Sequence, residues 1–534
     1  MSRIRLNSSI SVERTASGIH LRHHSHSLRI NARELGLRPQ EIIPLLDGTR
    51  DRNEIVSSVK RHLRRRVLEF LNTLEQNGFL DHVVDRKPHF LKRQKHSEYN
   101  GISNYLGELI GCLDKYQNLH AKWADERTGI LRYLITEPPN SSQFKSVWTS
   151  AATLRRSMAA KERSLKATAF GAGISSVEAI TKALGEALEL YAAGECAEHD
   201  LRYSAASSLD GEFLDPRALS LYSQAQYKTP SFPYEPFHLR KRLAWTRGRW
   251  LDTGADVWLP AFLTYFGAMP TLDQSYAEVT TSGLAAGTSL ADASMRAICE
   301  LIERDAFMIT WLARLPAQRL IPDVIDDGTR NVEAEFATHG MEIRTYLLNT
   351  GIAVPVVLSL IFGDGKNWPG AIVGLGAHAD PIAATQSAML ELALMAPALR
   401  SEMLQNKRRF PRRADQVKTP LDHALFYVPK RRARAFDFLE KENAAAVLLS
   451  DLPRPDRINL SFYRTRLADA EVRVALKNLT PKIVADDRSF RVVRALGTNL
   501  QPLHFGFGRE RTTTKRLRTL AKHNKLSLLP HPLA

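Results

Sequence analysis

Four glutamates stand out because they occur in two pairs with the same spacing. Glu186 and Glu189 enclose an Ala-Leu dipeptide, and Glu300 and Glu303 enclose a Leu-Ile dipeptide. Residues three apart lie about 60° apart around a helix, so each pair would share one helix face. Carboxylates that converge from two helices repel each other unless cations lie between them. Mg²⁺, whose coordination is commonly completed by substrate phosphates, suits such a site.

The sequence around each pair is apolar. Glu186 lies between two Ala-Leu dipeptides, and Glu300 lies between Ile298-Cys299 and Leu301-Ile302. A single pair of glutamates three residues apart usually lies on a solvated helix face. Carboxylates within strongly apolar helices cost free energy unless cations pair with them, so the surroundings favour a functional site. For the adjacent Arg304-Asp305, a simple ion pair on the helix surface stays an alternative.

Helices must carry these pairs, and the flanking sequence predicts where they lie. Residues 175–195 open with Ser176-Val-Glu, which is typical of a helix start. Residues 291–311 form the second helix, and Asp380-Pro381 begins a third over residues 381–396. Apolar strands are predicted over residues 354–361 and 371–374. The alternation of helix and strand signals from about residue 166 predicts an α/β (α+β) body, with helices on β-sheets.

The first 85 residues predict a separate small unit. Asp51 can cap one of its helices, and the last helix places Val67, Phe70, Leu71 and Leu74 on one stripe. The predicted strands cover residues 11–16, 19–24 and 27–31, and the predicted helices cover residues 39–46, 52–59 and 63–76. Strands followed by three helices are a winged-helix-like arrangement.

Two segments of this unit resemble the PqqD-like domain, also called the RiPP recognition element. They are LLDGTRDRNEIV (residues 45–56) and FLNTLEQNGFL (residues 70–80). The resemblance implies a domain that binds the leader part of a precursor peptide. The leader would add a strand to the edge near Ser27–Asn31, facing the helix from Val67 to Leu74, because an exposed edge offers unpaired backbone groups. The run Arg64-Arg65-Arg66 keeps a DNA-reading winged helix open as an alternative.

Residues 86–160 are predicted as a linker and helical connector. The basic and polar stretch 86–96 is typical of a linker, and helices are predicted over residues 104–119 and 145–158. Residues 136–142, which contain two prolines, are predicted as a loop. The sequence assigns no function to this segment.

The composition predicts a cytoplasmic protein. The chain has 534 residues, of which 44% are hydrophobic and 25% are charged. No apolar run is long enough to cross a bilayer, and residues 1–6 lack the apolar core of a signal peptide. The three cysteines Cys112, Cys196 and Cys299 form no CxxC motif, which favours reduced thiols over disulfides or a zinc site.

The formal net charge of +17 raises the question of nucleic acid. The basic residues are spread over residues 61–66, 86–95, 407–413 and 430–434, which fits solvated surface better than a nucleic-acid footprint. A basic chain also favours an acidic peptide or ATP as a ligand.

The remaining motifs resemble one family in order and in sequence. Two segments are similar to the two ATP-binding signatures of the YcaO family. They are GAGISSVEAITKALGEALELYAAGE (residues 171–195) and TSGLAAGTSLADASMRAICELIERDAF (residues 281–307). Four further segments follow in the family's order. They are IRTYLLNTGIAVPVV (residues 343–357), GLGAHADP (residues 374–381), VVRALGTNLQPLHFG (residues 492–506) and the tail LLPHPLA (residues 528–534). The resemblance covers about residues 166–534 and divides the chain at 1–85, 86–160 and 161–534.

The resemblance implies a role for each candidate residue. ATP and Mg²⁺ are the implied cofactors, and Glu186, Glu189, Glu300 and Glu303 are the implied metal and phosphate ligands, with Arg304 on phosphate oxygens. Further nucleotide contacts are implied for Thr288, Asp292 and Glu391, and Pro530 and Pro532 join the catalytic set. His423, His504 and His531 are candidates for proton transfer, with ordinary satisfied histidines as the alternative.

YcaO enzymes activate a backbone amide with ATP, and their azoline-forming members close a Cys, Ser or Thr side chain onto it. The resemblance therefore implies a cyclodehydratase that makes thiazolines and oxazolines in a ribosomal precursor peptide. An E1-like partner protein, a separate flavin-dependent dehydrogenase and a homodimer are left open, and no membrane is expected. Thioamide or amidine formation is the alternative chemistry. A non-catalytic peptide-binding scaffold is the alternative class, suggested by departures from the family pattern at Leu190, Ser282 and Ser387.

Overall fold

The structure is a computed structural model that describes most of the chain from residue 130 onward and several segments before it. The described residues are 3–6, 11–15, 18–22, 27–32, 42–76, 79–83, 130–139, 145–154, 168–196, 198–230, 232–266, 275–405, 410–441, 445–481, 484, 490–522 and 524–534. They belong to two compact units, one of Met1–Ile135 with Ala151–Ala169 and the other of Thr136–Ser150 with Phe170–Ala534.

The smaller unit contains two three-stranded antiparallel sheets. One has the order β5 (Asp47–Asp51), β1 (Arg3–Leu6) and β6 (Leu80–Val83), and the other has the order β2 (Ser11–Thr15), β3 (Gly18–Arg22) and β4 (Ser27–Asn31). The three predicted N-terminal strands are therefore present. Among the described strands, β4 pairs only with β3.

Two helices cover this part of the chain. The Asp51 carboxylate accepts the N–H of Glu54 at 2.9 Å, and the Glu54 carboxylate accepts the N–H of Asp51 at 2.7 Å, so a capping box begins α3 (Arg52–Ser57) as predicted. The stripe of α4 (Arg64–Gln76) predicted from Val67 to Leu74 is fully buried, in one cluster with Leu21 of β3 and Ile30 of β4.

The helix predicted over residues 39–46 is wrong in its described part. Ile43–Leu45 form a short 3-10 turn that contains Pro44, and Asp47 already begins β5. The backbone from Asp47 onward is a strand instead, because it pairs with β1, where Asp47 lies opposite Arg5. Residues 33–41 lie outside the described residues.

A third three-stranded sheet has the order β7 (Leu131–Glu137), β8 (Trp148–Leu154) and β9 (Thr168–Gly173). The helix predicted over residues 145–158 is therefore wrong. Trp148, Ser150 and Ala152 are buried while the residues between them are partly exposed, which is the period of a strand. The loop predicted from residue 136 begins later, because β7 extends to Glu137. The helix predicted over residues 104–119 lies outside the described residues.

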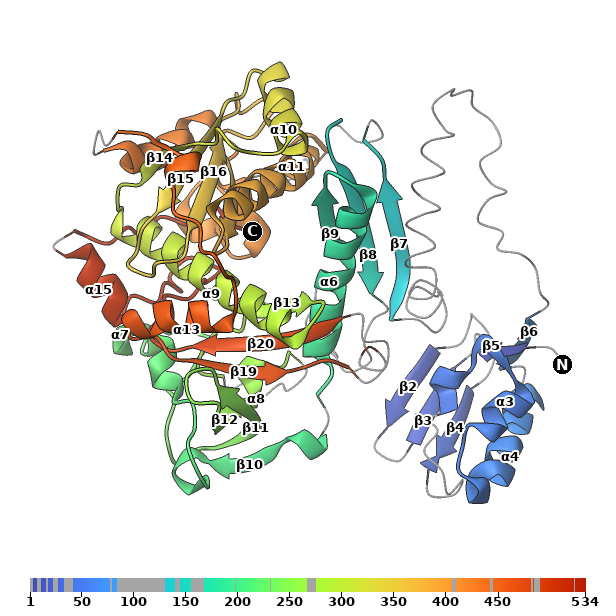
Figure 1. The fold of residues 1–534 in the computed structure, drawn as a ribbon. Helices are drawn as coiled ribbons and strands as arrows, with labels where there is room; N and C mark the ends of the chain where they lie inside the picture. The colour runs from blue at the N-terminus through green and yellow to red at the C-terminus, as the bar shows by residue number, and fades with distance from the viewer. Residues whose placement is uncertain are drawn as a thin grey trace, which may run out of the picture. The chain divides into compact units, whose positions relative to one another are not determined.

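The larger unit is built on two sheets (Figure 1). The six-stranded sheet has the order β10 (Arg202–Ala205), β11 (Arg242–Trp250), β19 (Val474–Asn478), β20 (Arg491–Gly497) and β13 (Leu284–Gly287), with β12 (Asp256–Pro260) also paired to β11. The five-stranded sheet has the order β17 (Ile372–Ala377), β16 (Val356–Ile361), β15 (Ile343–Leu348), β14 (Gln318–Ile321) and β18 (Val447–Leu448). This mixed α/β architecture confirms the predicted fold class.

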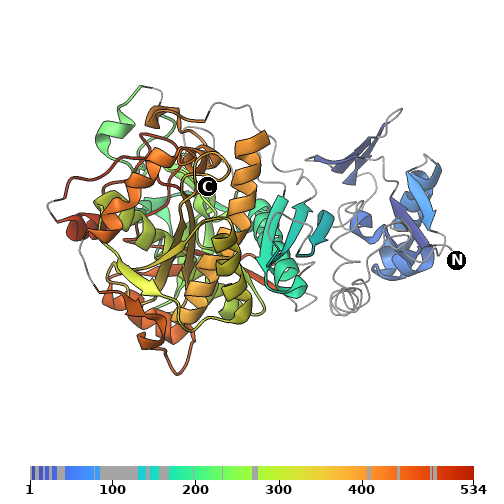
Figure 2. The same ribbon diagram turned by 90° about the horizontal axis from the view of Figure 1, so that it is seen from above.

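Helix α9 (Leu290–Ala313) lies between the two sheets. It contacts β13 and β20 on one side and β15, β16 and β17 on the other, and most of its side chains are buried. Helix α6 (Ser176–Gly194) covers β13 and β20, and α11 (Pro381–Gln405) packs on β16 and β17 and beside α10 (Asp327–Thr338). Figure 2 shows α11 as the long helix along one side of this unit. The three predicted helices are thus present, and α11 continues through Pro397.

The helices that carry the glutamates lie unusually close to strands. A side chain on Gly171 of β9 would lie 2.2 Å from the carbonyl oxygen of Ala179 in α6, and one on Gly287 of β13 would lie 2.4 Å from the nitrogen of Ala293 in α9. Gly374 and Gly376 of β17 approach α11 in the same way, at 2.2 and 2.1 Å from helix carbonyl oxygens. Glycine is required at such close approaches, which bring helix side chains within reach of strand N–H groups.

By length and composition alone, Pro381–Leu404 of helix α11 is long and apolar enough to cross a membrane. Half of that stretch is buried within the protein, and the helix packs on β16 and β17. A buried core helix has the same length and composition, so the contacts of α11 account for its character.

Candidate active site

Helix α6 directs two glutamates toward neighbouring strands. The Glu186 carboxylate accepts the N–H of Phe170 of β9 at 2.9 Å, and the Glu189 carboxylate accepts the N–H of Ala286 of β13 at 2.6 Å. The helix begins where Ser175 accepts the N–H of Glu178, so its first turn is fixed, and its register then sets both glutamates.

Helix α9 supplies the second pair. The Glu300 carboxylate accepts the N–H of Gly283 at 3.0 Å, just before β13, and its side chain is 25% exposed. The Glu303 side chain is 12% exposed and lies beside the N–H of Ala377 in β17. Gly283 has a φ of +83°, and a side chain there would lie 2.5 Å from the carbonyl oxygen of Ala495, so this position requires glycine.

Arg304 and Glu391 complete the group. One Arg304 amino group lies 3.2 Å from Glu303 and the other lies 3.6 Å from Glu300. Glu391, on α11, accepts the N–H of Leu375 of β17 and interacts electrostatically with Arg304. One guanidinium therefore faces three carboxylates, so the group has an excess of negative charge.

All five glutamates follow one scheme. Each is on a helix that packs on a strand, and each accepts or lies beside a backbone N–H at that strand or at its end. A backbone N–H orients a carboxylate without neutralising its charge. Charge is left over for a cation or for the donors around a phosphate.

The electrostatics show that the carboxylates lie close together. Burial raises the pKa of Glu189 to about 8, and the carboxylates of Glu300 and Glu186 add to that rise. Burial also raises the pKa of Glu303, Glu300 and Glu391, with Glu391 and Glu300 adding to the rise at Glu303. Arg304 opposes each of these three rises but does not cancel them. Carboxyl groups with raised pKa values attract cations, since a bound cation favours their charged form.

A second arginine, Arg494, interacts electrostatically with Glu300. Arg494 of β20 is 4% exposed, and its guanidinium donates to the carbonyl oxygens of Leu263, at 3.0 and 3.1 Å, and Thr280, at 2.9 Å. Its third nitrogen, Nη1, is buried with no hydrogen-bond partner in the structure. Burial lowers the pKa of Arg494 to about 10, and the nearby Glu300 opposes that shift. Arg494 was not among the residues predicted from the sequence, although a charged side chain inside the apolar stretch VVRAL is a usable signal.

A small cavity of about 80 Å³ adjoins the group. Arg304 and Glu391 line it together with Thr281, Ser282, Phe505 and Pro532. The four paired glutamates are not among its lining residues. Among the described residues, no group of three or more His, Cys, Asp or Glu side chains is placed to hold a metal ion.

The donor set nevertheless fits Mg²⁺ that is bound through phosphate. Mg²⁺ is commonly held by one or two carboxylates together with substrate phosphates and waters, not by an all-protein cage. Glutamate oxygens are hard donors of the kind that Mg²⁺ takes, and Arg304 is a guanidinium of the kind that binds phosphate. The unpaired Nη1 of Arg494 is a further donor beside Glu300.

The tail that contains Pro530 and Pro532 is buried and anchored. Tyr427 donates its hydroxyl to the carbonyl oxygen of Pro530, and the indole N–H of Trp311 donates to Leu529 at 2.8 Å. The structure therefore brings Pro532 into the cavity with Arg304 and Glu391, whereas Pro530 serves as an anchor point on Tyr427.

The three histidines considered for proton transfer form one buried cluster. His423 and His531 stack with ring centroids 4.1 Å apart, and the carbonyl oxygen of His531 lies 2.8 Å from Nδ1 of His423. Nε2 of His423 accepts the N–H of Gly506 at 2.9 Å, so His423 must be neutral with its proton on Nδ1. Burial lowers the pKa of all three histidines, and that of His423 to about 4. The satisfied-histidine alternative therefore describes His423.

Thr288 and Asp292 lie at the start of α9 and bind each other. Asp292 accepts the N–H of Thr288 at 2.9 Å and its hydroxyl at 3.2 Å, and Arg296 donates to the other carboxylate oxygen at 3.0 Å. They line neither described cavity. Arg296 links them to the glutamates, since its charge also acts on Glu189.

The sequence of this unit matches a known protein family. Residues 170–501 match the YcaO cyclodehydratase family, which is described as ATP- and Mg²⁺-binding. The match covers more than half of the chain, so the chain belongs to the YcaO family. ATP and Mg²⁺ are the cofactors of that family, as the sequence resemblance implied.

Two curated proteins are similar to part of the chain. An uncharacterized protein of the tfuA 3' region of Rhizobium leguminosarum bv. trifolii is 28% identical over 233 residues, which is 42% of this chain and 53% of that protein. An uncharacterized protein of Methanothermobacter thermautotrophicus is 26% identical over 226 residues, which is 42% of this chain and 55% of that protein. The chain thus spans about half the length of the curated relatives that it matches.

Solved structures share the fold. A heterocyclase in complex with substrate and cofactor has a TM-score of 0.64 at 17% identity, covering 79% of this chain and 57% of that one. The heterocyclase TruD has a TM-score of 0.53 at 13% identity, with 99% and 98% of the two chains covered. A chain of the E. coli microcin synthetase McbBCD complex has a TM-score of 0.50 at 15% identity, with 70% and 89% covered.

Proposed function

We propose that the chain is an ATP-dependent peptide cyclodehydratase that converts Cys, Ser or Thr residues of a ribosomal precursor peptide to azolines. Family membership supports ATP and Mg²⁺ as cofactors. The observation that carries the proposal is the group of five glutamates from three helices. They are oriented by strand N–H groups, and neighbouring carboxylates add to the raised pKa values of Glu189, Glu303 and Glu391, the last two beside Arg304.

Each candidate residue has a task in this proposal. When bound, Mg·ATP supplies the phosphoryl group that turns the oxygen of a backbone amide into a good leaving group. Glu186, Glu189, Glu300 and Glu303 would hold the metal and position the phosphates. Arg304 would stabilise the charge that develops on phosphate oxygens. Glu391 would keep Arg304 directed into the small cavity that both line.

The substrate enters through its backbone. The Cys, Ser or Thr side chain attacks the preceding carbonyl carbon, and the carbonyl oxygen leaves after phosphorylation, so one water is lost from the peptide. Pro532 and Phe505 line the cavity beside Arg304 and would limit the access of water to it. Thr288 and Asp292 are proposed as outer nucleotide contacts at the start of α9.

The smaller unit is proposed to dock the leader peptide. Strand β4 (Ser27–Asn31) pairs only with β3 among the described strands, so its other edge can accept an added strand. The stripe from Val67 to Leu74 is buried and supports that sheet from within, whereas Leu68 on the same helix is 41% exposed. Docking would make presentation of the core peptide intramolecular and raise its effective concentration.

The test uses the full chain with Mg·ATP and a candidate precursor peptide. We expect release of phosphate together with a peptide that has lost one water for each modified residue, measured by mass spectrometry. Glu303→Gln and Glu186→Gln are expected to abolish both. Glu195→Gln, beyond the end of α6, is the matched control.

Other products give other masses. An exchange of oxygen for sulfur would show a thioamide-forming enzyme, and a gain of nitrogen would show an amidine-forming one. Failure of the unaltered protein to bind nucleotide would overturn the proposal in favour of a peptide-binding scaffold. Equal rates with and without the leader would remove the docking role.

The remaining assignments extend the proposal. The chain is proposed to act in the cytoplasm, with residues 1–85 as the recognition domain and residues 161–534 as the catalytic domain. An E1-like partner protein, a flavin-dependent dehydrogenase that oxidises the azolines, and a homodimer are open components of the assembly.

A further inference from the structure

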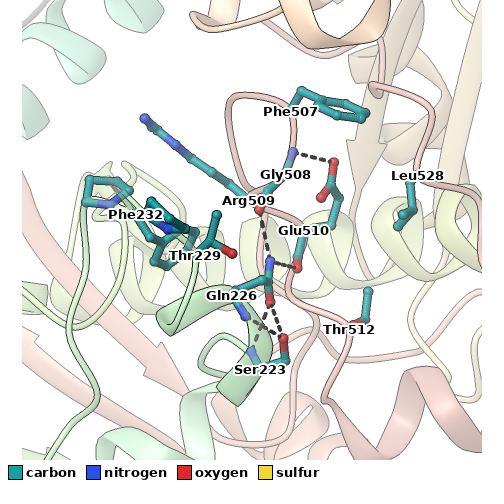
Figure 3. A pocket seen from close by; sticks show the side chains of 12 residues that line it. Ser223, Gln226, Thr229, Phe232, Phe507, Gly508, Arg509, Glu510, Thr512 and Leu528 are labelled. Atoms are coloured by element: carbon teal, nitrogen blue, oxygen red, sulfur yellow. Dashed lines mark hydrogen bonds between the residues drawn. The ribbon is translucent and has the colours of Figure 1, made fainter.

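A second and larger cavity, of about 530 Å³, lies outside the group of glutamates (Figure 3). One wall is formed by α7 (Gln224–Tyr227) with the residues around it, including Ser223, Thr229 and Phe232. The other wall is the segment 507–512, and Leu528 closes one end. Its volume is typical of a pocket for a small ligand or for a few residues of a peptide.

The two walls are held together by hydrogen bonds. The side-chain amide of Gln226 donates to the carbonyl oxygens of Gly508, at 3.0 Å, and Glu510, at 2.9 Å. The N–H of Gly508 in turn donates to the Glu510 carboxylate at 3.1 Å (Figure 3). Ser223 fixes Gln226 through a capping box at the start of α7. The pocket is therefore pre-formed, which reduces the entropy cost of binding.

The lining is apolar with one available charge. Phe507 is 44% exposed and Leu528 is 51% exposed, and both face the pocket together with Phe232 and two prolines. Burial raises the pKa of the Glu510 carboxyl, whose side chain turns back onto the N–H of Gly508. Arg509 forms no ion pair within the described parts of the chain. Figure 3 shows it reaching from its loop toward the wall that carries Thr229 and Phe232.

This combination selects a chemical class of ligand. The single guanidinium of Arg509 can pair with one carboxylate, whereas the charge of a nucleoside triphosphate would need several cations. Aromatic rings and prolines form the kind of surface on which an extended peptide lies. The lining therefore fits a peptide that carries an apolar side chain next to an acidic one.

One segment of chain contributes to the walls of both cavities. Leu503 and Phe505 line the small cavity beside Arg304, and Phe507 begins the wall of the larger pocket. Two residues of extended chain span at most about 7 Å, so the backbone of Phe507 lies within about 7 Å of that of Phe505 in the wall of the small cavity. The N–H of Phe507 is held by the carbonyl oxygen of Val417 at 2.9 Å, which fixes the segment between them.

We propose that this pocket is a specificity subsite for the substrate peptide. It binds the residues that flank the reacting Cys, Ser or Thr and prefers an apolar residue followed by Asp or Glu. The inference rests on the proposed peptide substrate. It goes beyond that function because it assigns sequence preference to Phe507 and Arg509, which lie outside the group of glutamates.

The test uses the full chain and three fluorescent synthetic peptides of Gly, Ser and Cys that differ only in one central pair, Phe-Asp, Phe-Lys or Ser-Asp. Fluorescence anisotropy gives their dissociation constants. We expect Phe-Asp to bind about tenfold more tightly than the other two, which corresponds to about 1.4 kcal/mol.

Arg509→Glu should reverse the preference in favour of Phe-Lys. Phe507→Ala should weaken Phe-Asp binding about tenfold, and Arg518→Glu, on the exposed face of α15 (Lys515–Ala521), is the matched control.

The outcomes separate this inference from the proposed function. Binding of a fluorescent ATP analogue with Mg²⁺ should be unchanged by Arg509→Glu and Phe507→Ala, which also shows that both variants fold. Equal affinity for the three peptides, or no effect of Arg509→Glu on the preference, overturns the subsite even if ATP binds. Loss of ATP binding by the unaltered protein would instead overturn the proposed function, whatever the peptides do.

Discussion

Two adjacent residues of α9, Arg304 and Asp305, lie in opposite electrostatic environments. Arg304 faces the carboxylates of Glu300, Glu303 and Glu391, so negative charge is in excess. Asp305 is fully buried and binds Arg516 at 2.7 Å, with the N–H of Gln501 at 2.7 Å on its other oxygen. The positive charge of Arg516 therefore balances the negative charge of Asp305, whereas the single positive charge of Arg304 faces several carboxylates.

The difference teaches how to read buried charge in this protein. A charge-balanced pair such as Asp305–Arg516 fixes the position of a helix, here by joining α15 to α9. Burial raises the pKa of Asp305 as well, so what distinguishes the group around Arg304 is that several carboxylates share one guanidinium. Such unbalanced charge needs a further ion to be stable, which is typical of a functional site. The alternative of a surface ion pair between Arg304 and Asp305 is wrong, since the two side chains have different partners.

The largest effect is expected at the balanced pair. Arg516→Met leaves Asp305 charged and buried without its partner, which should lower the free energy of unfolding by about 3–5 kcal/mol. The double variant Asp305→Leu with Arg516→Met should recover at least half of that loss, because the unpaired charge is removed. Urea denaturation measures both. A single variant as stable as the unaltered protein would show that the pair contributes little.

The neutral histidine cluster should make stability depend on pH. The pKa of His423 is about 4 in the folded protein against an ordinary 6.5, so the unfolded chain binds the proton more readily. Stability from this residue is therefore complete above pH 6.5 and is lost as the pH falls from 6.5 toward 4, by about 3 kcal/mol.

Urea midpoints measured across this range provide the check. His423→Asn, which retains an amide donor toward His531, should make the dependence less steep, and the lowered pKa values of His504 and His531 keep the rest of it. The same substitution at the exposed His199 should leave it unchanged. An unchanged slope in His423→Asn would contradict the prediction.

Arg304→Met should affect ligand binding more than folding. The three carboxylates can take up protons when the guanidinium is removed, so we expect a smaller loss of stability than in Arg516→Met. Each charge-assisted hydrogen bond to phosphate contributes about 1.5–3 kcal/mol, so the affinity for Mg·ATP should fall about 10- to 100-fold. Titration with a fluorescent ATP analogue measures this. Equal affinities would place the phosphates elsewhere.

The smallest effect is expected at Arg296, the other arginine of α9. Its side chain is 64% exposed and pairs with Asp292 at 3.0 Å. Exposed pairs contribute about 0–1 kcal/mol, so Arg296→Ala should change the unfolding free energy by less than about 0.5 kcal/mol. A larger loss in urea denaturation would show that the start of α9 depends on this pair. A fall in Mg·ATP affinity would support the proposed role of Asp292.

The sequence predicted the elements whose signals are local. Asp51 caps the helix that it was expected to cap, and α6 begins at the predicted Ser176-Val-Glu. The apolar stretches at residues 354–361 and 371–374 contain the strands Val356–Ile361 and Ile372–Ala377. Strand β8 was mistaken for a helix because its alternating burial covers few residues and includes the small side chains of Ser150 and Ala152. A short pattern of that kind does not separate the two periods.

The sequence by itself determined that Glu186 and Glu189, and likewise Glu300 and Glu303, share a helix face, because helical geometry fixes residues three apart. Tertiary structure decided their partners. Strand N–H groups reach the carboxylates only because glycines allow the helices to approach, and Arg494, the histidine cluster and the buried tail meet the site from distant parts of the chain. Contacts between residues far apart in sequence depend on how the sheets pack, and no local pattern encodes that packing.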